Sequence, residues 1–71
     1  MLDKKALRMK MLEQNCSVLE LSKKIGVSKA ALYRRLNGVV AFTVPEMQAC
    51  KEHLNLTDAE RDKIFFNPKV T

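Results

Sequence analysis

The sequence predicts an all-α protein, a compact domain built from five short helices. Three observations lead to this prediction. Helix-capping signals recur at short intervals, apolar residues follow them at helical spacing, and no stretch alternates with the period of two that a strand requires. A chain of 71 residues is long enough for one domain with a small core. We therefore expect a single domain over residues 1–66 and a C-terminal tail over residues 67–71.

The first two helices are defined by the signals at their ends. Asp3 is a suitable N-cap for a first helix that stops just before Asn15, a residue that tolerates the left-handed conformation. The segment Ser17-Val-Leu-Glu20 is a capping box, in which the serine hydroxyl and the glutamate carboxylate each accept a backbone N–H. It begins a second helix that runs to about Ile25 and ends at Gly26.

The third helix separates a buried face from an exposed one. Ser28 caps it, and we expect it over residues 29–37. With Leu32 at the centre of the inner face and a turn of about 100° per residue, Arg34 lies nearly opposite, in solvent. Arg35 falls near the boundary, where its stem packs and its charged head reaches water. The rest of the outer face carries Lys29, Ala30, Tyr33 and Asn37.

Two more capping boxes begin the last two helices. Thr43-Val-Pro-Glu46 begins the fourth, with Pro45 in the first turn, where its missing N–H costs nothing. Thr57-Asp-Ala-Glu60 begins the fifth, which ends near Phe65 and Phe66. Packed together, the five helices are expected to bury a core made of Leu7, Met11, Leu21, Ile25, Val27, Leu32, Leu36, Phe42, Met47, Leu54, Ile64 and Phe65.

Positive charge is concentrated in the middle of the chain. The formal net charge is +5, and no Asp or Glu occurs between Glu20 and Glu46. That interval contains Lys23, Lys24, Lys29, Arg34 and Arg35. A local field of one sign attracts a polyanion such as nucleic acid, although a merely solvated basic face would have the same composition.

The two helices that carry this charge also have a recognisable pattern. The stretch LSKKIGVSKAALYRRLNG, residues 21–38, resembles the helix-turn-helix of the lambda-repressor-like (Cro/repressor) superfamily. The matching features are a small residue at Ser22, Gly26 four residues later, a turn formed by GVS, and apolar Leu32. LYRRLNG followed by FTVPEM is similar to small phage and prophage Cro-like proteins. The resemblance covers roughly residues 10–66 and implies a central helix-turn-helix within a lambda-repressor-like domain.

The resemblance also implies which residues meet double-stranded DNA. The base-facing residues would be Lys29, Ala30, Tyr33 and Arg34. The phosphate contacts would be Ser17, Lys23, Lys24, Ser28, Asn37 and Thr43, the last together with its neighbouring backbone amides. The sequence departs from the family at Val18, where a glutamine often contacts DNA and braces the recognition helix. Valine can do neither, so Val18 is not a candidate contact.

The function implied is a sequence-specific DNA-binding transcriptional regulator, a Cro-type repressor of a phage or prophage with helix 29–37 in the major groove. A homodimer through the fourth and fifth helices and Phe66 would suit a palindromic site. The alternative is a small helix-turn-helix protein that binds and modulates another regulator, as an anti-repressor or co-repressor, without base-specific recognition.

Other function classes find little support. The sequence contains no nucleophile–base pair, paired carboxylates or phosphate-cradling glycine loop, so we expect no enzyme, no cofactor and no small-molecule substrate. Cys16 and Cys50 are expected to be buried free thiols, and His53 a polar surface residue without a zinc ligand set. No apolar run is long enough to span a membrane, and we expect a cytoplasmic protein.

Overall fold

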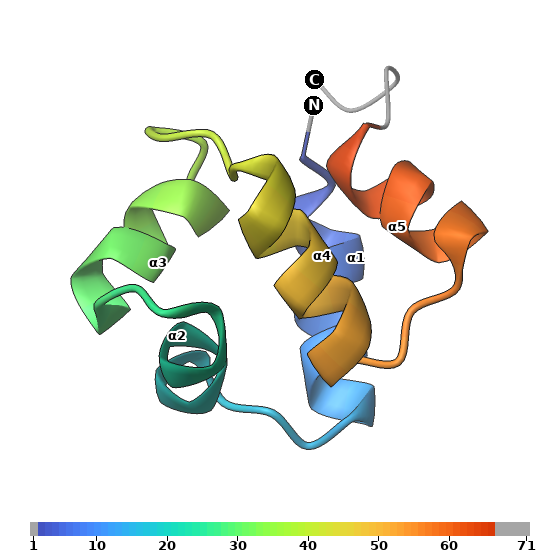
Figure 1. Ribbon diagram of the computed structural model, residues 1–71, viewed down its shortest axis with the longest axis horizontal. Coiled ribbons are helices and arrows are strands. Elements are labelled where there is room, and N and C mark those ends of the chain that lie inside the picture. Colours follow the sequence, from blue (N-terminus) through green and yellow to red (C-terminus); the bar gives the residue numbers. More distant parts are fainter. Residues whose placement is uncertain (1, 67–71) are drawn as a thin grey trace.

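The computed structural model describes residues 2–66, which form five helices and no strand. The helices are α1 (Lys4–Glu13), α2 (Val18–Ile25), α3 (Lys29–Leu36), α4 (Val44–His53) and α5 (Asp58–Phe65) (Figure 1). The all-α, five-helix prediction is confirmed. α3 ends one residue earlier than predicted, because Asn37 is its C-cap. The tail predicted over residues 67–71 lies outside the described residues.

Side-chain caps account for the start of every helix. The N-caps Asp3, Ser17, Ser28, Thr43 and Thr57 each accept a backbone N–H of the first turn. The three predicted capping boxes are complete, each with its glutamate accepting the N–H of the cap residue. Each box satisfies two N–H groups that a helix start would otherwise leave without partners.

Three of the connections have the same form. Asn15, Gly26 and Asn55 each adopt a positive φ after a helix, at 56°, 80° and 55°. An apolar or thiol residue follows and packs inward, and a serine or threonine then caps the next helix. Residues 15–17, 26–28 and 55–57 share this three-residue pattern. This short pattern is enough to stop one helix and cap the next.

The helices pack into a small globule with α4 near its centre. α2 packs against α3 and α4, and α5 packs against α4 and α1. In Figure 1, α2 and α3 lie on one side of the molecule and α5 on the other, with α4 between them. Ion pairs reinforce the α5 side: Lys10 meets Glu60 at 2.7 Å, and Lys51 meets Asp58 at 2.7 Å.

The observed core agrees with the predicted one except at its edges. Ile25, Val27 and Met47 are only partly buried and pack against the periphery of the core. Val18 and Leu56 are buried, although neither was predicted to be. The remaining buried apolar residues are Leu7, Met11, Leu21, Leu32, Leu36, Phe42, Cys50, Leu54, Ile64 and Phe65. The rings of Phe42 and Phe65 meet edge to face, with centroids 5.2 Å apart, which joins the α3–α4 connection to α5.

Candidate nucleic-acid interface

The turn between α2 and α3 is tight, and its first two N–H groups are hydrogen-bonded. Gly26 adopts φ +80°, and the N–H groups of Gly26 and Val27 both donate to the carbonyl of Ser22 at 3.0 Å. Ser22 itself is buried, and its hydroxyl donates to the carbonyl of Leu19 at 2.7 Å. A small polar residue is therefore accommodated here without leaving a polar group unsatisfied.

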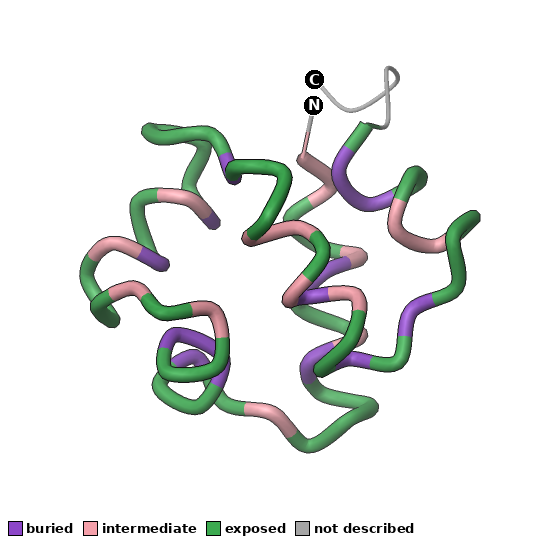
Figure 2. Tube along the Cα trace, in the orientation of Figure 1, coloured by how far each residue is buried: buried purple, intermediate pink, exposed green. Residues whose placement is uncertain are grey.

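The outer face of α3 is exposed, as the helical wheel predicted. Leu32 and Leu36 are buried, whereas Arg34 is exposed and Tyr33 is 39% exposed. Figure 2 shows exposed turns along α3 and along most of the connection to α4. Nothing in the described part of the chain covers this face.

All ten predicted contact residues are exposed. Ser17, Ser28 and Thr43 are the N-caps of α2, α3 and α4, and Asn37 is the C-cap of α3. The other six lie on the last turn of α2 or on α3: Lys23, Lys24, Lys29, Ala30, Tyr33 and Arg34. Their assignment to bases and phosphates remains a prediction.

The start of α3 differs from the starts of α2, α4 and α5. The third residue of α3 is Ala31 rather than glutamate, so no carboxylate lies at this helix start. Within residues 2–66 the backbone N–H groups of Ser28, Lys29 and Ala30 have no acceptor. Three donors at the positive end of a helix suit an anionic or hydrogen-bond-accepting partner.

The start of α4 offers fewer donors than predicted. The N–H of Thr43 donates to Glu46 Oε1 at 3.0 Å, and Pro45 has no N–H. From Thr43 to Glu46, only the N–H of Val44 has no acceptor in the part of the chain that the structure describes. The Thr43 hydroxyl accepts the Glu46 N–H at 3.3 Å, and its own hydrogen remains able to donate.

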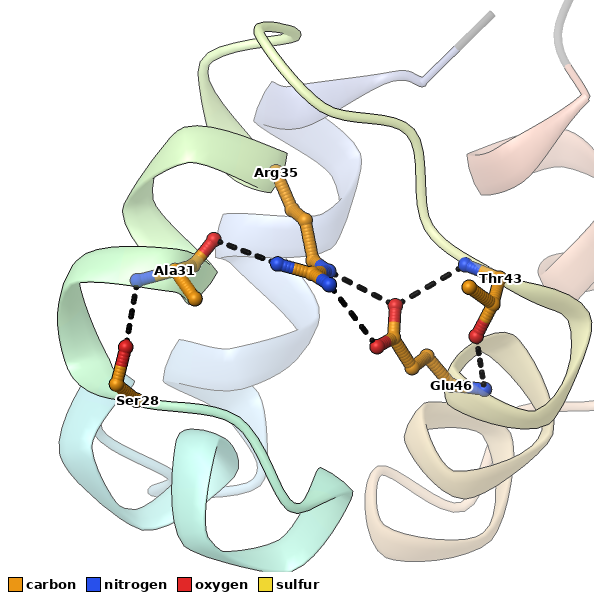
Figure 3. Close-up of polar contacts among 5 residues, drawn as sticks. All are labelled: Ser28, Ala31, Arg35, Thr43 and Glu46. Atoms are coloured by element: carbon orange, nitrogen blue, oxygen red, sulfur yellow. Dashed lines mark hydrogen bonds and ion pairs between the residues drawn. The ribbon is translucent and has the colours of Figure 1, made fainter.

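Arg35 does not extend into solvent, and that prediction is wrong. Its Nε and Nη2 donate to the two carboxylate oxygens of Glu46 at 2.8 and 3.2 Å, and its Nη1 donates to the Ala31 carbonyl at 3.1 Å (Figure 3). The two charged side chains are 16% and 13% exposed. Burial alone would raise the pKa of Glu46, but the hydrogen bonds from Arg35 and Thr43 outweigh it and lower that pKa.

A second polar contact joins α3 to the beginning of the chain. Lys4 Nζ donates to Asn37 Oδ1 at 2.7 Å, although the residues are 33 positions apart. The contact occupies the Asn37 amide oxygen and leaves its NH2 group, the donor that a phosphate would need, available. It also brings an additional cation, Lys4, to the same edge of α3. Nothing in the local sequence could have indicated this pair, because it depends on how α1 packs.

The basic residues of α2 and the outer face of α3 lack acidic partners. Ion pairs join α1 to α5, α4 to α5, and α3 to α4. None of the ion pairs among residues 2–66 includes Lys23, Lys24, Lys29 or Arg34. The field of these four cations is therefore not cancelled locally.

Val18 takes part in the core rather than in the surface. Its side chain is 8% exposed at the first position of α2, where it packs with the other buried apolar residues. This is consistent with its exclusion from the predicted contacts. A valine that faces inward supplies apolar packing where a glutamine would have supplied a polar group.

The cysteines are free, and the structure supports inert thiols. Cys50 is buried, which raises its pKa to about 12, and burial also raises the pKa of Cys16, which is only partly buried rather than fully as predicted. No cluster of metal-ligating side chains occurs among residues 2–66. None of the described helices has the length and hydropathy needed to cross a bilayer.

Comparison with known proteins adds one finding. A protein-family model described as Helix-turn-helix matches residues 7–60, which include α2, α3 and the turn between them. No curated protein and no solved structure matched the chain.

Proposed function

We propose a function from one premise: the chain belongs to the lambda-repressor-like (Cro/C1-type) helix-turn-helix family of DNA-binding transcription regulators. The proposed function is that of a sequence-specific repressor of the phage and prophage type. α3 is its recognition helix and enters the major groove. The observation that carries this proposal is the exposed outer face of α3, where Arg34 and Lys29 have no acidic partner among residues 2–66.

Base recognition follows from the side chains of that face. Ala30 is small and close to the start of α3, so the helix can approach the base edges. Arg34 can donate two parallel hydrogen bonds to O6 and N7 of a guanine, which is worth about 1–3 kcal/mol of discrimination. Tyr33 supplies a hydroxyl and an apolar ring beside Arg34. Lys29 lies on the first turn, within reach of a base or a phosphate.

Phosphate contacts on either side of the groove would fix the position of α3. Lys23 and Lys24 lie on the last turn of α2, next to the turn that leads into α3. Each hydroxyl of Ser17, Ser28 and Thr43 accepts a backbone N–H and keeps its own hydrogen for a phosphate oxygen. We add Lys4 to the predicted set, because its contact with Asn37 holds it beside the end of α3.

Selection of bound duplexes from a random DNA pool tests this proposal. At about 150 mM salt, binding that is purely electrostatic is already weak, so enrichment requires base recognition. We expect one motif to emerge whose contacts depend on Arg34. Recovery of no motif by folded protein would overturn the proposal.

A dimer would explain how so small a DNA-binding domain gains affinity for its DNA site. Helix-turn-helix dimers bind two half-sites about one helical turn apart. We propose that two copies meet through α4 and α5, where Phe66 is 53% exposed. Sedimentation equilibrium on wild type and on Phe66→Ser tests this, and a monomeric wild type on a palindromic duplex would contradict it.

A second function is favoured by a separate observation. Met9 and Leu12 on α1 are 58% and 81% exposed, three residues apart on one side of the helix. An exposed apolar pair suits a protein partner, as a modulator of another regulator would need. The salt dependence of binding separates the two functions, because affinity for DNA falls with a slope near −0.9 for each phosphate contact.

A further inference from the structure

The position of α3 depends on polar contacts as well as on its core leucines. The helix that α3 packs against most closely is α2, at the turn. Two polar side-chain contacts join α3 to other helices: Arg35 to Glu46 of α4, and the C-cap Asn37 to Lys4 of α1. These contacts are in place to restrain rotation of α3 about its own axis.

The Arg35 contact is part of a continuous chain of hydrogen bonds. Ser28 accepts the N–H of Ala31 at 3.0 Å, and the Ala31 carbonyl accepts Arg35 Nη1 at 3.1 Å. Arg35 then donates to both oxygens of Glu46, and Glu46 Oε1 also accepts the N–H of Thr43. Figure 3 shows that the chain runs from the start of α3 to the cap of α4. It therefore links two predicted phosphate contacts, Ser28 and Thr43.

A small rotation of α3 would be enough to lose a base contact. A side-chain atom about 6 Å from the helix axis moves by about 1 Å when the helix turns by about 10°. A shift of that size takes a hydrogen bond from good to poor geometry. Arg34 directly precedes Arg35, so whatever fixes Arg35 also fixes the direction in which Arg34 leaves the helix.

We propose that the Arg35–Glu46 pair is a positioning device for base recognition, which fixes the rotation of α3 against the start of α4. Arg35 itself does not touch DNA. The pair couples the phosphate anchor at Thr43 to the placement of Arg34, so sequence discrimination depends on a contact made within the protein. This inference rests on the proposed function, since it concerns how the same face discriminates between sequences.

The test compares Arg35→Gln, Glu46→Gln and the double variant. Dissociation constants are measured for the duplex selected by wild type and for a scrambled duplex, at a temperature where circular dichroism shows each variant folded. Glutamine is compatible with a capping box, so Glu46→Gln keeps the start of α4. Arg35→Lys, which keeps the charge but not the two-pronged contact, is measured as well.

Each single variant is expected to reduce the affinity ratio between the two duplexes about tenfold, the order of one lost arginine–guanine contact. Affinity for the scrambled duplex should move in opposite directions, falling in Arg35→Gln and rising in Glu46→Gln, because the first removes a positive charge and the second a negative one. The double variant should discriminate no worse than either single variant. Arg35→Lys should be intermediate.

Glu60→Gln is the matched control. Glu60 occupies the same position in the capping box of α5 and pairs with Lys10 at 2.7 Å, so the same chemistry is removed away from α3. We expect its affinity ratio to equal that of wild type. An equal change in Glu60→Gln and Glu46→Gln would show a general effect of stability and overturn the inference.

Two further outcomes separate this inference from the proposed function. If wild type discriminates and Arg35→Gln discriminates equally well, or if Arg35→Gln weakens all duplexes alike and lowers the salt slope by about 0.9, Arg35 does not act by positioning. If wild type itself binds both duplexes equally, the proposed function fails and this inference fails with it.

Discussion

The two sides of the molecule use their cations differently. On α4 and α5, Lys51 meets Asp58 at 2.7 Å and Arg61 meets Asp62 at 3.0 Å. On α2 and the outer face of α3, the described residues provide no carboxylate for Lys23, Lys24, Lys29 or Arg34. Exposed ion pairs contribute at most about 1 kcal/mol to stability. Their larger effect here is on the electrostatic potential, which the ion pairs reduce around α4 and α5 and which remains positive around α2 and α3.

The helix starts show the same difference. α2, α4 and α5 begin with complete capping boxes and carry a glutamate in the first turn, whereas α3 has only the Ser28 hydroxyl. A glutamate at position 31 would add cap stability but would place a negative charge at the end of α3 that is proposed to meet DNA. The helix without a glutamate in its first turn, α3, is therefore the one whose start is proposed to meet phosphate.

The largest expected effect concerns the core. It tests whether the two sides of the molecule, which differ at the surface, share one core. Leu32 of α3 and Leu54, the C-cap of α4, are both 0% exposed, so truncating either to alanine should cost about 2–5 kcal/mol of unfolding free energy. Urea unfolding followed by circular dichroism measures both. Similar losses would confirm that the two sides share one core and differ only at the surface. A loss in Leu54→Ala alone would show that α3 is loosely attached.

The next effect concerns the outer face of α3. Arg34→Ala should weaken binding to the selected duplex by about 1–3 kcal/mol and relax the preference at one base position, with little change in Tm. Lys63→Ala removes an exposed cation from α5 and should leave the same dissociation constant unchanged. Fluorescence anisotropy on both variants gives the answer. Equal losses would mean that only total charge matters.

A smaller effect distinguishes phosphate contacts from base contacts. Lys23→Ala and Lys24→Ala should each weaken binding to all duplexes evenly and reduce the salt slope by about 0.9. Lys51→Ala is the control, because Lys51 already pairs with Asp58 and lies on the other side. Titrations at several salt concentrations measure the slopes. A sequence-dependent loss in either lysine variant would contradict its assignment to phosphate.

The smallest expected effect is the loss of folding stability in acid. The carboxylates that form ion pairs on α4 and α5 should account for most of it. Glu46, Asp58 and Glu60 all have lowered pKa values in the folded protein. Their contribution is present above the unfolded pKa, ordinarily near 4.5 for a glutamate, and is lost as the pH falls through the lowered folded value. Glu46→Gln should therefore be less stable than wild type at about pH 6, and the difference should be smaller at about pH 3. Urea unfolding at both pH values measures it, and a constant difference would contradict the linkage.

The elements of the fold were predictable because their signals are local. N-caps and glycine or asparagine stops act within a few residues, so the start of every helix and the ends of the first three could be identified from the sequence. The exposed face of α3 followed from helical periodicity once Leu32 was taken as inward. Asn55 was missed, although it has the same left-handed conformation as Asn15 and likewise follows the end of a helix.

The details of the site required tertiary contacts. Arg35 lay at the core boundary of the wheel, but only the packing of α4 against α2 brings Glu46 to it. The contact between Lys4 and Asn37 spans 33 positions and has no sequence signal. Val18, in the first turn of its helix, would ordinarily be expected at the surface, and its burial likewise depends on the neighbouring helices.

Mapping backbone amide shifts by NMR during titration with the selected duplex tests the central claim most directly. We expect the perturbed amides to cluster at the starts of α2 and α3, along the outer face of α3, and around Thr43 and Val44. Apart from the proposed dimer contact around Phe66, the amides of α5 should remain unchanged. The central claim is that DNA binds to α2 and α3, whose basic residues lack ion-pair partners. Perturbations concentrated on α5 or on the outer face of α1 around Met9 and Leu12, with α3 unaffected, would contradict it.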